Sequence, residues 1–408
     1  MSLNKEGHGA SMTKSNMNMA RIIVVGGGFA GLWASVAASR KLAAQEGKKA
    51  TVTLISRDDY LTVRPRLYEA KPQGLRVPLE SVLRPADVLF REATVVALNP
   101  STRSITLDDN RSDRIEIAYD RLVLATGSEL RSLPVPGIAE HAFNIDTFAA
   151  AVALDVHLAE LGQRPAGAGD DTVVILGAGF TGIELASEMR NRLAVHWGQA
   201  RAAAAQVLLV ERAGVIGAEL GVNPRPYIEA ALLEQRVQVR LNALLDRVEP
   251  DAVWLASGER IKTNTTIVTA GLCASPLAKA VPGAKLDDLG RLHVNSALQV
   301  DGVPGIYAAG DIARAYVDDE HLALMSCQHA IHMGTVAGHN VARDLLGLPP
   351  HPYSQPDYVT CLDLGSSGAL FTEGWGRQIR QTGAEAKNLK RQINTEWIYP
   401  PQGNRTAI

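Results

Sequence analysis

The sequence predicts an α/β fold in which one unit, made of a strand, a glycine turn, a helix and a second strand, occurs twice. The first copy starts with the apolar run at 22–25, which leads into Gly26 and an Ala-rich stretch with helical periodicity. The second copy starts with the apolar run at 172–176 and reaches Gly177, 151 residues after Gly26. Two such copies predict two Rossmann-like units built on parallel sheets.

The two copies also end alike. Ala125-Thr126-Gly127 follows an apolar strand in the first copy, and Thr269-Ala270-Gly271 follows one in the second. A later apolar strand ends at Gly310-Asp311, with a helix over 330–345 behind it, so we expect the second unit to be inserted into the first. The predicted divisions are an unstructured N-terminus at 1–20, a first domain at 21–145 and 286–350, a second domain at 146–285, and a C-terminal region at 351–408.

Composition excludes several classes of protein. The 408 residues are 46% hydrophobic and 21% charged, and 41 basic against 43 acidic residues give a net charge of −2, which offers no field for nucleic acid. No run of eighteen apolar residues predicts a spanning helix, and residues 1–20 lack the apolar core of a secretory signal, so we expect a cytoplasmic protein. Three scattered cysteines, Cys273, Cys327 and Cys361, provide neither a disulfide scaffold nor a closely spaced dithiol.

Both glycine turns carry the pattern G-x-G-x-x-G, at Gly26, Gly28 and Gly31 and at Gly177, Gly179 and Gly182. The first glycine permits the turn, the second lets a pyrophosphate approach the backbone, and the third lets helix and strand pack closely. The alternative is a pair of purely structural turns. Two matches, each between a strand and a helix, favour two dinucleotide sites, and such a pair suggests a bound flavin that receives hydride from a nicotinamide.

Acidic residues at strand ends refine this interpretation. Glu211 follows the strand at 207–210, where a carboxylate accepts hydrogen bonds from a ribose diol and so favours NADH, although Arg212 beside it keeps NADPH open. At the matching strand end of the first copy stand Ser56, Arg57, Asp58 and Asp59. Asp311 is placed to accept from ribityl hydroxyls, and the alternative is a helix N-cap.

These motifs resemble the two-dinucleotide-binding flavoprotein superfamily. Phe180-Thr-Gly-Ile-Glu184 and Cys327-Gln328-x-x-x-His332 are similar to motifs of type II NADH:quinone oxidoreductases, and the resemblance covers about residues 20–375. It implies FAD on the first unit, NADH on the second and Asp311 at the flavin ribityl chain. It places Glu184 beside nicotinamide and quinone, and Gln328 and His332 in the quinone pocket.

The cofactor-binding residues expected from the motifs and the resemblance lie in the glycine loops and at the strand ends. For FAD they are Gly26, Gly28, Phe29, Ala30, Gly31, Ser56, Arg57, Val95, Ala125, Thr126, Gly127, Gly310 and Asp311, and for NADH they are Gly177, Gly179, Phe180, Thr181, Gly182, Glu211 and Gly271.

His332 occupies a position where the family has glutamine, so the resemblance does not identify the type of quinone or the class of electron acceptor. An imidazole there could supply one of the two protons that quinone reduction consumes, and the alternative is an ordinary polar residue of a helix. We expect no metal site from His329, His332 and His339, because no carboxylate or cysteine lies at matching spacing.

Near the C-terminus, Leu389, Ile393 and Trp397 recur on one face of a predicted helix within 376–400. The basic residues expected on its other sides are Arg377, Arg380, Lys387, Lys390 and Arg391. This pattern is typical of a helix at a membrane surface, and the alternative is packing on the body of the protein or on a second copy.

The predicted function is an FAD enzyme that takes hydride from NADH and passes two electrons to a quinone, peripherally at the cytoplasmic face of a membrane. Alternatives are a ferredoxin-type reductase, a sulfide:quinone oxidoreductase-like enzyme if Cys327 and Cys361 meet, and an NADH-binding redox sensor. Candidate partners besides NADH and quinone are a membrane surface and a second copy of the chain.

Overall fold

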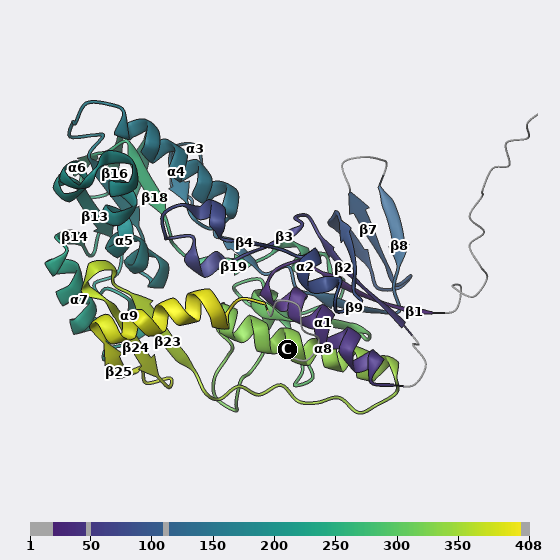
Figure 1. The fold of residues 1–408 in the computed structure, drawn as a ribbon. Coiled ribbons are helices and arrows are strands. Elements are labelled where there is room, and N and C mark those ends of the chain that lie inside the picture. Colours follow the sequence, from purple (N-terminus) through teal and green to yellow (C-terminus); the bar gives the residue numbers. More distant parts are fainter. Residues whose placement is uncertain (1–18, 46–49, 109–113, 401–408) are drawn as a thin grey trace, which may run out of the picture.

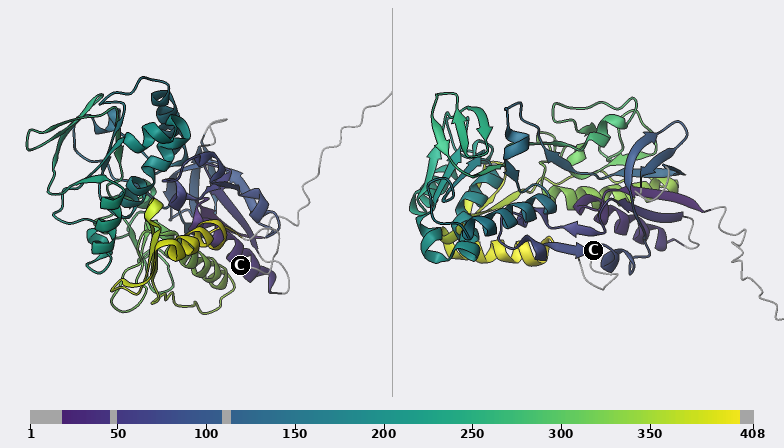
Figure 2. Two further views of the ribbon diagram at one scale, coloured as in Figure 1. Left: turned by 60° about the vertical axis from the view of Figure 1, so that its left-hand side comes forward. Right: turned by 90° about the horizontal axis from the view of Figure 1, so that it is seen from above.

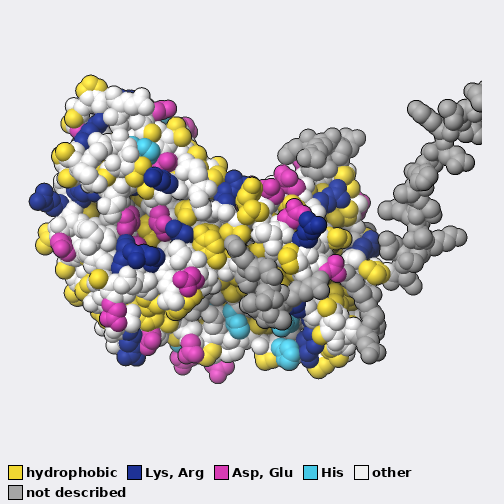
Figure 3. All heavy atoms as spheres, viewed as in Figure 1, with side chains coloured by type: hydrophobic (Ala, Val, Ile, Leu, Met, Phe, Trp, Pro, Cys, Tyr) yellow, Lys and Arg dark blue, Asp and Glu magenta, His cyan; other side chains and the backbone are white. Residues whose placement is uncertain are grey.

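The computed structural model describes residues 19–45, 50–108 and 114–400, so the expectation for residues 1–20 lies almost entirely outside the described residues. Two lobes lie side by side, and the C-terminal segment runs along both of them (Figure 1). Two further views show the same lobes (Figure 2). Acidic and basic side chains are interspersed over the face in Figure 3, in keeping with the balanced composition.

The first lobe is built on a five-stranded parallel sheet with the order β21-β9-β1-β2-β5. Its strands are β1 (Ala20–Val25), β2 (Ala50–Ser56), β5 (Leu89–Glu92), β9 (Arg121–Leu124) and β21 (Ile306–Ala308). The central strands are apolar along their length because helices or loops cover both faces of a parallel sheet. Since β21 comes last in the chain, the chain returns to this sheet after building the second lobe, which confirms the predicted insertion.

Helices α1 (Phe29–Ala43) and α8 (Cys327–Leu345) pack closely against each other in this lobe. A Cβ on Gly334 of α8 would lie 2.3 Å from the Ala30 carbonyl oxygen, and one on Gly338 would lie 2.2 Å from that of Ala34. The absent side chains therefore allow the two backbones to touch. This contact places the N-terminus of α8, with Gln328, close to the first glycine loop.

The second lobe contains another five-stranded parallel sheet, with the order β11-β18-β12-β13-β14. Its strands are β11 (Phe143–Asn144), β12 (Thr172–Leu176), β13 (Gln206–Val210), β14 (Val237–Arg240) and β18 (Thr265–Val268). Its helices are α4 (Phe148–Gly162), α5 (Phe180–Trp197), α6 (Gln199–Ala204) and α7 (Arg225–Glu234). Together the two sheets confirm the predicted α/β class with two Rossmann-like units.

Smaller elements complete and join the lobes. Two antiparallel three-stranded sheets consist of β6 (Thr94–Asn99), β7 (Ser104–Asp108) and β8 (Ile115–Ala118), and of β15 (Leu245–Glu249), β16 (Ala252–Leu255) and β17 (Arg260–Lys262). An antiparallel pair, β10 (Ser128–Leu130) and β19 (Leu272–Ala274), directly follows Gly127 and Gly271. The remaining short elements are β3 (Tyr60–Thr62), β4 (Arg76–Pro78), α2 (Glu80–Leu83), α3 (Ile138–His141), β20 (Leu292–His293) and β22 (Ala313–Arg314).

The expected helix within 376–400 is present, but it begins only at Gly383, after a small sheet. The C-terminal region forms an antiparallel sheet of β23 (Val359–Asp363), β24 (Ala369–Glu373) and β25 (Gln378–Thr382), followed by α9 (Gly383–Gln392) and a π-helical turn at Ile393–Trp397. Arg377 therefore lies in a turn and Arg380 in a strand, and Lys390 is buried on the side of α9 that faces the body. Within the described residues, no helix has the length and apolar character needed to cross a bilayer.

Candidate functional site

A cleft of about 2170 Å³ runs between the lobes, and both glycine loops line it. The predicted site residues among its lining are Gly26, Gly28, Phe29, Ala30, Ser56, Arg57, Val95, Ala125, Thr126, Gly127, Gly177, Gly179, Phe180, Thr181, Glu184, Glu211, Gly271, Gly310, Asp311 and Gln328. The predicted residues outside this set are Gly31, Gly182 and His332. Residues from distant parts of the chain thus meet at one continuous hollow.

Gly31 and Gly182 lie behind the loops, where helix meets strand. A Cβ on Gly31 would lie 1.8 Å from the Gly26 carbonyl oxygen, and one on Gly182 would lie 1.9 Å from that of Gly177. No side chain fits at these distances. Both glycines therefore act through close packing, which is the property expected of the third glycine in each loop.

The first loop has the space and the unsatisfied polar groups that a dinucleotide requires. No described atom lies within 4 Å of a Cβ built on Gly28 or on Gly127. Thr126 lines the cleft, and its hydroxyl oxygen is buried without a hydrogen-bond partner within the described chain. Buried polar groups are normally paired, so the unpaired hydroxyl and the open space at Gly28 and Gly127 fit a dinucleotide such as FAD.

Asp311 follows β21 at the floor of the same cradle. The Ser128 hydroxyl donates to its Oδ2 at 2.6 Å, and the Arg64 guanidinium lies 3.7 Å from that oxygen and also pairs with Asp146. Burial raises the pKa of Asp311, while Ser128 and Arg64 act against that rise. Sequence reasoning missed Arg64 and Asp146, since no motif links two residues 82 positions apart.

The second loop holds Glu211 in a fixed orientation. The backbone N–H of Ala178 donates to Glu211 Oε2 at 2.8 Å, and that of Ala213 donates to Oε1 at 2.8 Å. The carboxylate is therefore locked at the end of β13 beside the loop. Each oxygen keeps a lone pair for a further donor, such as a ribose hydroxyl.

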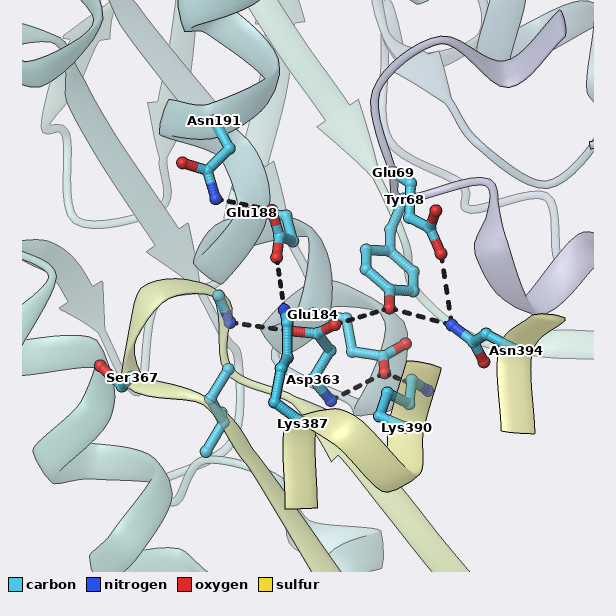
Figure 4. Close-up of polar contacts among 12 residues, drawn as sticks. Tyr68, Glu69, Glu184, Glu188, Asn191, Asp363, Ser367, Lys387, Lys390 and Asn394 are labelled. Carbon is cyan, nitrogen blue, oxygen red and sulfur yellow. Dashed lines mark hydrogen bonds and ion pairs between the residues drawn. The ribbon is translucent and has the colours of Figure 1, made fainter. Parts of the chain in front are cut away.

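Glu184, in α5, forms a buried ion pair with Lys390 of α9 (Figure 4). The Lys390 ammonium lies 2.8 Å from Glu184 Oε1 and donates to the Cys361 carbonyl at 2.9 Å. The Asp363 backbone N–H donates to the same Glu184 oxygen at 3.0 Å. Both side chains of the pair line the cleft, so the C-terminal helix contributes a charge to the site.

A second set of contacts surrounds this pair. The Tyr68 hydroxyl donates to Asp363 Oδ2 at 3.0 Å, and Lys387 pairs with Asp363 and, at 2.8 Å, with Glu188 of α5 (Figure 4). The network joins the first lobe, the second lobe and the C-terminal region. Lys387 and Lys390 were expected on an exposed basic surface, and their ion pairs with acids of the body correct that expectation.

Electrostatics in this network are set mainly by burial. Burial raises the pKa of Glu184 to about 7, although the ammonium of Lys390 attracts its negative charge and opposes the rise. Burial also raises the pKa of Tyr68, and the charge of Glu184 adds to that effect. For Lys390, burial lowers the pKa, but the attraction of Glu184 outweighs it and the net shift is upward.

Gln328 and His332 are separated by the structure. Gln328 lines the cleft, whereas His332 is exposed and lies outside the lining, with its Nε2 3.1 Å from the Ser354 carbonyl oxygen. The placement of His332 in the acceptor pocket is therefore corrected. A stack that sequence reasoning missed lies near Gln328, with Tyr358 and Trp375 at 4.9 Å between ring centroids.

Cys327 and Cys361 both line the cleft, and both are free thiols. Burial raises the pKa of Cys327 to about 11 and that of Cys361 to about 12. Because the thiolate is the reactive form, thiols with such values are poor nucleophiles at neutral pH. No group of three or more His, Cys, Asp or Glu residues is arranged to hold a metal ion in the described part of the chain.

Known proteins resemble this chain along most of its length. A model of the pyridine nucleotide-disulphide oxidoreductase family matches residues 20–334. An NADH dehydrogenase-like protein of Mycobacterium tuberculosis is 43% identical over 96% of this chain and 97% of its own length. A type II NADH:quinone oxidoreductase of Staphylococcus saprophyticus is 26% identical over 93% of this chain and 95% of its own length.

Solved structures share the fold at low identity. The sulfide:quinone oxidoreductase of Aquifex aeolicus superposes with a TM-score of 0.75 at 18% identity, over 92% of this chain and 90% of its own. NDH2 from Plasmodium falciparum, in complex with NADH, superposes with a TM-score of 0.73 at 13% identity, over 93% of this chain and 95% of the NDH2 chain.

Proposed function

Because this chain belongs to the pyridine nucleotide-disulphide oxidoreductase family, we propose that it is an FAD-dependent enzyme that oxidises NADH and reduces a quinone. The observation that carries the proposal is that both glycine loops open onto the cleft that also holds Glu184, Lys390 and Gln328. Such a cleft brings a reductant, a flavin and an acceptor together, which is the protein's contribution in enzymes of this kind.

In this proposal FAD lies on the first loop, with its pyrophosphate at the N-terminus of α1 and its ribityl chain at Asp311. The open space at Gly28 and the unpartnered Thr126 hydroxyl support that position. Bound there, FAD supplies the group that accepts hydride and returns electrons in pairs. NADH lies on the second loop, and the locked carboxylate of Glu211 favours a ribose diol over a 2′-phosphate.

Reduction of a quinone to a quinol consumes two protons, and the Glu184–Lys390 pair is the group we assign to this task. Both residues line the cleft, and a carboxyl group with a pKa of about 7 exchanges protons readily at neutral pH. Lys390 and the Asp363 N–H fix the position of the carboxyl group. His332 has no part in the proposal, since it lies outside the cleft.

The pKa of Glu184 gives a pH dependence for quinone reduction. Glu184 donates a proton when protonated, so the rate after reduction by NADH should fall as pH rises through about 7. The Glu184→Gln variant should be slower and should lose this fall. Stopped-flow mixing of the NADH-reduced protein with menadione, from about pH 5.5 to about 9, measures both rates. An identical pH profile in the variant would count against the assignment.

Steady-state and spectral measurements test the function as a whole. The purified protein should be yellow, should bleach on addition of NADH, and should regain its colour with menadione or a short-chain ubiquinone. Protein that bleaches with NADH but is not reoxidised by any quinone would contradict quinone reduction and leave NADH oxidation standing. Sulfide in place of NADH should not bleach the protein, because both cleft thiols are protonated at neutral pH.

A further inference from the structure

The carboxylate of Glu219 occupies the second glycine loop. The backbone N–H of Phe180, at the N-terminus of α5, donates to Glu219 Oε1 at 2.7 Å. A Cβ built on Gly179 would lie 2.7 Å from the same oxygen. The carboxylate therefore lies against the second glycine of the loop, in the space through which a pyrophosphate approaches the backbone.

The first glycine loop provides a matched comparison within the same chain. Gly28 and Gly179 hold equivalent positions before α1 and α5 and share one backbone conformation, with φ −78° and ψ −170° at Gly28 and φ −78° and ψ −172° at Gly179. A Cβ on Gly28 meets no described atom within 4 Å. The two loops thus differ in their contents, and the difference is the side chain of Glu219.

The position of Glu219 follows from charge and from a tight turn. The free N–H groups and the positive end of the dipole of α5 attract a carboxylate as they attract a phosphate. Glu219 lies in a single 3₁₀ turn at Ala218–Leu220, between Gly217 and Gly221, whose φ values of 54° and 78° lie in the left-handed region. The next side chain, Leu220, is buried and anchors the turn, while Glu219 itself is exposed.

We propose that Glu219 is a built-in competitor for the pyrophosphate of NADH and so determines the affinity of the second loop for dinucleotides. The inference rests on the proposed binding of NADH at this loop. Two anions cannot share the same N–H donors, so the carboxylate leaves when the pyrophosphate arrives. The apparent dissociation constant is then the intrinsic one divided by the fraction of molecules in which the loop is open. Every ligand with a pyrophosphate is weakened in this way, and adenosine is not.

Binding of ADP-ribose and of adenosine to the FAD-loaded protein tests the proposal by calorimetry. In Glu219→Gln and Glu219→Ala, ADP-ribose should bind about three- to tenfold more tightly than in the wild type, because the competing charge is gone. Adenosine should change by less than about twofold. Glu229→Gln removes the same charge from an exposed position on α7 outside the cleft lining, and should leave both ligands unaffected.

The outcomes separate this inference from the proposed function. If the wild type binds ADP-ribose and both variants bind it equally tightly or more weakly, the proposed role of Glu219 is wrong, while NADH binding at this loop is not contradicted. Weaker binding in particular would mean that Glu219 holds the nucleotide. Equal tightening of ADP-ribose and adenosine would also overturn it, since the effect would not depend on the pyrophosphate. If neither the wild type nor the variants bind ADP-ribose, the inference and NADH binding at this loop both fail.

Discussion

Lys390→Met should destabilise the protein by about 3–5 kcal/mol at pH 8, since removing one partner of a buried ion pair leaves the other charge uncompensated. Glu184 and Lys390 are 3% and 6% exposed, so little water is available to solvate the carboxylate once the ammonium is removed. Chemical denaturation of the wild type and the variant at the same pH measures the difference. Quinone reduction should be lost with it, because the carboxyl group of Glu184 loses its fixed position.

The loss of stability should depend on pH in a defined direction. The folded-state pKa of Glu184 is already raised above its ordinary value of 4.5 to about 7, and removal of Lys390 raises it further. At a pH below the pKa of the carboxyl group in the unfolded chain, the group is protonated in both states and its raised folded-state pKa costs no stability. As pH rises from that pKa toward the pKa in the folded protein, the loss of stability grows. The difference in unfolding free energy between Lys390→Met and the wild type should therefore narrow as pH falls from 8 through about 7, below which Glu184 is protonated in both folded proteins.

Two further variants distinguish the pair from general damage to α9. Lys387→Met removes a neighbouring cation whose side chain is 26% exposed, and we expect a smaller loss of stability because solvent screens its ion pairs. Glu184→Gln combined with Lys390→Met removes both charges and should recover most of the stability without recovering quinone reduction. Equal stability of Lys390→Met and the wild type at pH 8 would contradict a charged buried pair.

The parts of the site that the sequence predicts are those that depend on local backbone geometry. Gly26, Gly28 and Gly31 lie within six consecutive residues at the turn and the start of α1, and their spacing indicates the close approach of helix and strand that a dinucleotide site requires. Glu211 and Asp311 were predicted because each follows an apolar strand, where a carboxylate can accept hydrogen bonds from the hydroxyls of a nucleotide. Both fold class and cradle follow from such patterns.

The contribution of the C-terminal helix α9 to the site could not be predicted from the sequence in this way. Lys387 and Lys390 lie three residues apart on α9, a spacing that equally fits an exposed basic surface, and their partners lie 199 and 206 positions away. Only the folded chain shows that Glu188 and Glu184 of α5 face them. Periodicity locates a helix and its faces, but it does not identify what each face meets. The expectation for His332 came from the resemblance of a motif, which likewise does not show that the side chain lies outside the cleft lining, beside Ser354 of a separate segment.

Gly28→Ala should abolish most FAD binding while leaving the protein without FAD as stable as before. The new methyl group points into open space, and the φ of −78° suits alanine, so we expect a change in stability below about 1 kcal/mol. The same methyl group lies where a pyrophosphate must approach the backbone, and we expect FAD affinity to fall by about ten- to a hundredfold. Flavin fluorescence during titration of the apoprotein measures affinity, and thermal unfolding measures stability.

Two glycines provide the controls for this prediction. Gly31→Ala introduces a Cβ 1.8 Å from the Gly26 carbonyl oxygen, so it should lower both stability and FAD binding by disrupting the packing of α1 on β1. Gly74→Ala, where the methyl group also meets no described atom within 4 Å, should change neither. If Gly28→Ala binds FAD as tightly as Gly74→Ala does, the pyrophosphate does not lie on the first loop, and the arrangement of both nucleotides across the cleft must be different.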